Sequence, residues 1–72
     1  MRFSAKDVFE ITGVKRNRLQ AWIERGFISP SIQKANGHGT RNIWSKKDLK
    51  RIKKFRKLVE IGYSRRLAAT KI

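Results

Sequence analysis

Residues 4–26 read SAKDVFEITGVKRNRLQAWIERG, and this stretch decides the fold. Apolar residues at helical spacing lie on both sides of a Thr-Gly pair, and glycine gives the backbone the freedom for a sharp turn. The pattern predicts a first helix over residues 5–11, with Val8 and Ile11 facing inward, and a second from residue 15 or 16 to residue 25. Two short helices joined by a tight turn form a helix-turn-helix.

Residues 32–44 read IQKANGHGTRNIW and predict a basic hairpin. Asn36-Gly37 and Gly39 are typical of hairpin turns, and Ile32 and Ile43 are the expected strand residues on either side. This predicted two-stranded wing, residues 31–44, carries cations and no acid. A helix-turn-helix followed by a basic wing is suited to gripping DNA in two grooves.

The remainder of the chain predicts two more helices. Ser45 with Asp48, like Ser4 with Asp7 in the first helix, has the spacing of a capping box. A third helix is expected over residues 46–61, and a short last one over residues 65–71. The apolar stripe of the third helix comprises Leu49, Ile52, Phe55 and Val59. The predicted fold is therefore mainly α: a winged helix-turn-helix with a two-stranded β wing, a third helix and a short C-terminal helix, all in one domain over residues 1–72.

The charge balance points to a polyanionic partner. Nineteen Lys and Arg against five Asp and Glu give a net charge of +14, far above what solubility requires. Nucleic acid, an acidic membrane and a heparin-like polymer are each polyanions that could bind a protein of this charge. With no cysteine and one histidine, neither a disulfide framework nor a zinc site is expected, and no cofactor is predicted. The start, MRFSAKDVF, lacks the apolar run of a signal peptide, so a cytoplasmic location is expected.

The second predicted helix opens with KRNR, residues 15–18, although cations are unfavourable at a helix N-terminus. A recognition helix accepts this cost because its first residues reach base edges. Arginine can bind guanine in a bidentate fork, and Asn or Gln can do so with adenine. The contact residues predicted from this chemistry are Lys15, Arg16, Asn17, Arg18 and Gln20 in the helix, with Lys34, His38 and Arg41 in the wing.

Each of these features also has an ordinary structural explanation that involves no DNA. Two core helices with a glycine turn occur in many small domains, and a glycine-bearing loop is often only solvated. His38 suits a loop tip or plain surface better than a metal site. Trp22 and Trp44 are both expected in the core, although Trp22 could offer its indole N–H to a phosphate at the rim. In the third helix, cations far outnumber acids, and part of that face is expected near a nucleic-acid backbone.

In the order and spacing of its motifs, the chain resembles the DNA-binding domain of the MerR family of transcription regulators. The resemblance rests on FSAKDVFEITGV, RLQAWIERGFI, a glycine-containing wing ending in NIWS, and KKDLKRIKKFRKLVEIGYS, in that order. It implies duplex DNA as partner, with the second helix in the major groove and the wing on flanking DNA. A monomer is expected, or a dimer formed on DNA or through a further C-terminal region, and RNA polymerase is a candidate partner.

The chain departs from the family pattern at several contact positions. Gln20 stands where the family commonly has a phosphate-binding Arg, and Ala21 and Trp22 stand where it often has two tyrosines. Asn42 replaces a frequent Arg near the end of the wing, and Arg41 beside it is a candidate substitute. Asn42 and Trp22 therefore join the predicted DNA-contact residues.

Three rival functions remain open from the sequence. An excisionase-like architectural protein shares the small winged helix and bends DNA. A basic RNA-binding or ribosome-associated protein would prefer structured RNA, and a membrane-active basic helix would need its apolar residues free. An enzyme is the least favoured class, because the sequence has no carboxylate cluster, Cys–His pair or phosphate-cradling glycine loop.

Overall fold

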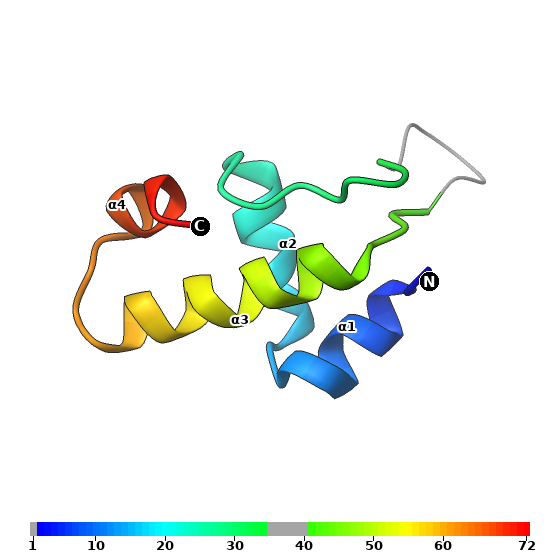
Figure 1. The fold of residues 1–72 in the computed structure, drawn as a ribbon, viewed down its shortest axis with the longest axis horizontal. Coiled ribbons are helices and arrows are strands. Elements are labelled where there is room, and N and C mark those ends of the chain that lie inside the picture. The colour runs from blue at the N-terminus through cyan, green and yellow to red at the C-terminus, as the bar shows by residue number, and fades with distance from the viewer. Residues whose placement is uncertain (1, 35–40) are drawn as a thin grey trace.

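The computed structural model describes residues 2–34 and 41–72. Within them lie four helices: α1 (Ala5–Thr12), α2 (Arg16–Glu24), α3 (Lys46–Glu60) and α4 (Arg65–Thr70). Their order and bounds agree with the predicted helices to within one or two residues. The long helix α3 crosses in front of α2, with α1 and α4 beside its two halves (Figure 1). Among the described residues, every helix is too short or too polar to cross a lipid bilayer.

Both predicted capping boxes are confirmed. At the start of α1, the Ser4 Oγ accepts a hydrogen bond from the Asp7 N–H at 3.3 Å, and an Asp7 oxygen accepts one from the Ser4 N–H at 2.9 Å. Ser45 and Asp48 make the same pair of bonds at the start of α3, at 3.2 and 2.8 Å. Each box satisfies two backbone donors that a helix start leaves unpaired.

The turn between α1 and α2 is fixed by Thr12 and Gly13. The buried Thr12 hydroxyl donates to the Val8 carbonyl at 2.6 Å and accepts from the Val14 N–H at 3.2 Å. Gly13 adopts a left-handed conformation with φ of 73°. The prediction that Ile11 faces the core is wrong, because Ile11 is 44% exposed. Thr12, one turn after Val8, takes the inward position instead.

The core lies where α3 meets α2. The Trp22 ring packs edge-on against Phe55, with centroids 4.7 Å apart, and Phe27 stacks on Phe55 at 6.0 Å. Trp44 is completely buried, as is Ile52. The core placement predicted for both tryptophans is confirmed, and α2 is held against α3 by large aromatic surfaces.

Within the described residues, the two segments beside the predicted wing tip pair with each other at one point, and the second of them also pairs with the N-terminal segment. Gln33 and Ile43 exchange backbone hydrogen bonds of 3.2 and 2.8 Å, and Phe3 pairs with Trp44 through two bonds of 2.9 Å. The expected strand residue Ile32 is 40% exposed, and the pairing falls on its neighbour Gln33. Of the two expected strand residues, Ile43 forms this bridge and Ile32 lies next to it. The turn residues Asn36-Gly37 and Gly39 lie outside the described residues, so the two-stranded wing stays a prediction.

Candidate nucleic-acid interface

The outward face of α2 is polar and open to solvent. Leu19 and Trp22 are buried against the rest of the molecule, so the opposite side of a helix with 3.6 residues per turn presents Asn17, Gln20 and Glu24. All three are exposed. Arg16 and Arg18 are exposed as well, and the same geometry places them on the two borders of this face.

The start of α2 attracts anions. Lys15 occupies the N-cap position, and among the described residues its side chain makes no capping hydrogen bond. The first turn of α2 carries no acid, and the Asn17 Oδ1 accepts from the Arg18 N–H at 3.0 Å. The positive end of the helix dipole thus coincides with the cationic side chains of Lys15, Arg16 and Arg18. This arrangement disfavours the isolated helix and favours a bound anion.

One border of the α2 face meets the segment that follows the predicted wing tip. A shallow hollow is lined by Arg16 and Gln20 of α2, by Asn42 and by Trp44, and apolar residues of α1 and α2 form the remaining wall. The fold therefore brings together Arg16, Gln20 and Asn42, which the sequence placed in two separate motifs.

The other border of the α2 face gathers further arginines. Lys15, Arg18 and Trp22 line a hollow together with Arg56 of α3. A neighbouring hollow is lined by Asn17, Arg18 and Arg25, with Arg65 from the first position of α4. Sequence reasoning did not single out Arg25, Arg56 or Arg65, although the Arg65-Arg66 pair at the start of α4 was a visible signal.

Arg56 has a structural role besides its charge. Its Nη1 donates to the Thr12 carbonyl at 2.7 Å, and its Nε pairs with Glu60 at 3.0 Å. These bonds attach the middle of α3 to the turn that precedes α2. The position of the α2 N-terminus is thus fixed by a contact between residues 44 apart in sequence.

Glu24 is a further residue that the sequence reading missed. It lies on the exposed face of α2 and accepts a hydrogen bond from the Gln20 Nε2 at 3.2 Å. This bond orients the Gln20 amide along the helix. A carboxylate repels phosphates and can accept from the amino group of cytosine.

The predicted wing contacts are only partly described. Lys34 and Arg41 are exposed on the two chain segments that flank the predicted tip, and the Gln33 Nε2 donates to the Arg41 carbonyl at 2.8 Å. Asn42 is half-buried. His38 lies outside the described residues. Lys34 and Arg41 are thus available to a partner that reaches the wing.

Asp48 anchors the segment that enters the wing. Besides the capping box, its Oδ2 accepts from the Ser31 N–H at 2.9 Å and from the Ser31 Oγ at 2.8 Å. Burial raises the pKa of the Asp48 carboxyl, but the hydrogen bonds from Ser45 and Ser31 together outweigh it and hold the pKa below its ordinary value. The ionised side chain therefore fixes the wing segment on the start of α3.

The comparison with known families agrees with this arrangement. The model described as MerR HTH family regulatory protein matches residues 3–70. The chain therefore belongs to the MerR family of helix-turn-helix regulatory proteins, whose function is DNA binding in transcription regulation. A search of the curated proteins finds no match to this chain.

Proposed function

We propose that this protein binds duplex DNA sequence-specifically and regulates transcription, with α2 in the major groove. The observation that carries the proposal is the exposed face of α2, which presents Asn17 and Gln20 between Arg16 and Arg18. The helix start beside it is cationic and has no side-chain cap among the described residues. Such a face offers both kinds of bidentate base contact, Arg with guanine and Asn or Gln with adenine. Its position at the helix N-terminus is the one that recognition helices use.

The remaining candidates serve to orient the protein on the duplex. Lys15 and the rim of Trp22 would contact phosphates beside the recognition helix. Lys34, Arg41 and His38 would hold the flanking DNA through the wing, and Asn42 would reach the same backbone from beside Arg16 and Gln20. Contacts of this kind set register and affinity and carry no sequence information directly.

The setting of this activity follows from the same proposal. We expect a non-enzymatic protein of one domain that acts in the cytoplasm, pairs with a second copy on DNA and works beside RNA polymerase. Structured RNA is the alternative partner. The major groove of an RNA duplex is deep and narrow, so the exposed α2 face supports a DNA duplex over an RNA duplex.

The base-reading role is tested by the substitution Arg18→Ala. If Arg18 makes a bidentate contact to a base, its loss weakens binding to the selected target by about 1–3 kcal/mol and relaxes the preference at one position. Fluorescence anisotropy against the target and a random duplex gives both affinities. Lys53→Ala, which removes one exposed cation from α3, is the matched control and should weaken both duplexes alike or leave both unchanged. An unchanged ratio of specific to random affinity in Arg18→Ala would remove Arg18 from the reading set.

A further inference from the structure

The outer face of α3 carries five lysines that the α2 interface does not use. We define the lysine stripe as Lys46, Lys50, Lys53, Lys54 and Lys57, all of which are exposed. At 3.6 residues per turn they fall within an arc of about 100°. The buried residues of the same helix, among them Ile52 and Phe55, occupy the opposite side.

Among the described residues, no lysine of the stripe forms an ion pair, although Glu60 lines a hollow with Lys53 and Lys57. Four of the five acidic residues are engaged elsewhere: Asp7 and Asp48 in the capping boxes, and Glu24 and Glu60 with neighbours on their own helices. Lysines three or four residues apart on a helix repel one another and destabilise it. The repulsion among five lysines on one face of α3 is relieved when an external polyanion binds to them.

The lysine stripe faces away from α2. Helix α3 crosses in front of α2 in Figure 1, and the contact between Phe55 and Trp22 places the core between the two helices. The exposed face of α2 and the outer face of α3 therefore lie on opposite sides of a molecule whose two shorter dimensions are 21 and 19 Å. A DNA segment held by α2 leaves the stripe open to a second segment.

From these observations we infer that the lysine stripe binds the phosphate backbone of a second segment of duplex DNA. Lys57 follows Lys46 by eleven positions, which is about 16 Å along the helix axis. That length of duplex carries about ten phosphate charges on its two strands. Lysine is a mobile point charge and binds phosphates with few demands on geometry, which suits contact with a backbone in any sequence.

Other anionic partners fit this surface less well. The stripe contains no aromatic ring on which a single-stranded base could stack. A membrane-binding helix inserts its apolar side into the lipid, but the apolar side of α3 is buried, with Ile52 and Phe55 fully covered. Duplex DNA needs neither stacking nor insertion.

This inference rests on the proposed function, because α2 must hold the first duplex. With both surfaces filled, one protein molecule bridges two duplexes or folds one long duplex back on itself. The protein would then shape DNA as well as read it.

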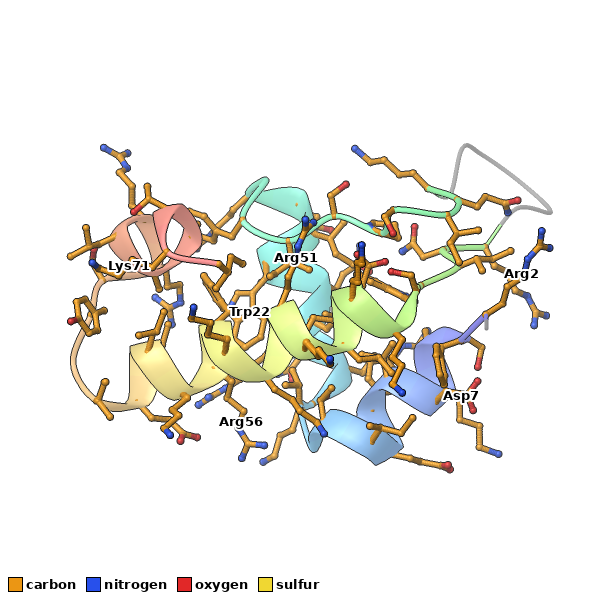
Figure 2. All side chains as sticks on the ribbon, viewed as in Figure 1. Arg2, Asp7, Trp22, Arg51, Arg56 and Lys71 are labelled. Atoms are coloured by element: carbon orange, nitrogen blue, oxygen red, sulfur yellow. The ribbon has the colours of Figure 1, made fainter. Side chains whose placement is uncertain are left out.

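A bridging assay with the full chain tests the inference. One duplex is fixed to beads, a second duplex carries a fluorophore, and capture of fluorescence requires both to be bound at once. The stripe variant combines Lys50→Gln, Lys54→Gln and Lys57→Gln. Its matched control removes the same charge elsewhere through Arg2→Gln, Lys6→Gln and Lys71→Gln. Figure 2 shows Arg2 and Lys71 at opposite ends of the molecule.

We expect the wild type and the control variant to capture the second duplex. In the stripe variant, capture of the second duplex should fall about tenfold or more. The slope of log affinity against log salt for the second duplex should decrease in magnitude by about 2.7, as expected for three lost phosphate contacts. Binding of a single target duplex, measured by anisotropy, should be alike in the two variants. Circular dichroism checks that both variants keep their helices.

Several results would overturn the inference. Wild type that binds single duplexes specifically but never bridges them would refute the second surface and leave the proposed function standing. Equal loss of capture in both variants would attribute bridging to net charge, and capture retained by the stripe variant would attribute it to protein–protein contact. Wild type that bridges duplex to RNA, but not duplex to duplex, would refute the assignment of DNA. A failure of specific binding to a single duplex would instead refute the proposed function.

Discussion

At the scale of single residues, Gly13 is the position where the turn of the helix-turn-helix is most constrained. Its φ is 73°, and a Cβ built there would lie 2.8 Å from the Arg56 Nη1, which is held by the Thr12 carbonyl. Gly26 has a similar φ of 79° but open space around it. Substitution at Gly26 therefore measures backbone strain alone, and substitution at Gly13 measures the same strain together with a steric clash.

We expect Gly26→Ala to lower the free energy of unfolding by about 1–2 kcal/mol, the cost of a left-handed residue with a side chain. Gly13→Ala should lower it by about 1 kcal/mol more, because Arg56 must give up its hydrogen bond to Thr12. Urea denaturation measures both. In an Arg56→Ala background the two substitutions should have similar effects, and a persisting difference there would show that Arg56 is not the cause.

Asp48 makes stability depend on pH. Its pKa is lower in the folded protein than in the unfolded chain, so ionised Asp48 stabilises the fold fully above its ordinary value of 3.8. That contribution is lost as pH falls through the folded pKa. Asp48→Asn should lower the free energy of unfolding at pH 7 by about 1–3 kcal/mol, since bonds to a charged acceptor are replaced by bonds to a neutral one.

The test of Asp48 is a comparison of urea midpoints for wild type and Asp48→Asn from pH 7 to pH 2. The two should converge at the acidic end, where the wild-type carboxyl is protonated. A difference that stays constant across this range would mean that the charge of Asp48 contributes little and that its shape alone matters.

At the scale of elements, the residues at the start of α2 lower the stability of the helix, and we propose that they bind DNA. The N-cap residue Lys15 contributes no side-chain hydrogen bond in the described structure, although Ser or Asp is preferred at this position. Lys15→Ser should raise the free energy of unfolding by about 0.5–1 kcal/mol. It should also weaken all DNA duplexes and lower the salt slope by about one, because one phosphate contact is removed.

Thermal denaturation and anisotropy at several salt concentrations measure the two effects of Lys15→Ser. Lys6→Ser, at the second position of α1, is a control for loss of one exposed cation. A stabilised variant with undiminished DNA affinity would show that Lys15 has no part in binding.

The helices were predictable because their signals are local. Both capping boxes, the Thr-Gly turn and the spacing of Leu49, Ile52 and Phe55 are legible within a few residues, and helix bounds follow from them. The exposure of Ile11 was predicted wrongly, and the bridge at Gln33 beside the expected strand residue Ile32 was not foreseen, because both depend on how the elements pack. In each case a neighbour, Thr12 or Gln33, takes the position.

The candidate site was predictable only in part. The cations that open α2 stand out in the sequence, since acids are usual there. The contributions of Arg56 and of Ser31 were not foreseeable, because their partners Thr12 and Asp48 lie 44 and 17 residues away. The grouping of Arg18 with Arg65 likewise requires the placement of α4.

At the scale of the whole molecule, the net charge of +14 accounts for affinity toward DNA, and recognition of a base sequence needs a separate explanation. Charge alone gives salt-sensitive binding to any duplex. The uncapped cationic start of α2, its amides and Glu24 are the features that charge alone does not explain. They are expected to matter most where salt has suppressed non-specific binding.

The central claim is that α2 reads base sequence. It is tested most directly by incubating the protein with a random duplex pool, recovering the bound fraction at about 150 mM salt, where non-specific binding is weak, and sequencing it. We predict enrichment of a defined motif, whose repeat and spacing report how many copies bind. Tight binding at low salt with no enrichment at about 150 mM would contradict the claim and leave charge as the only basis of association.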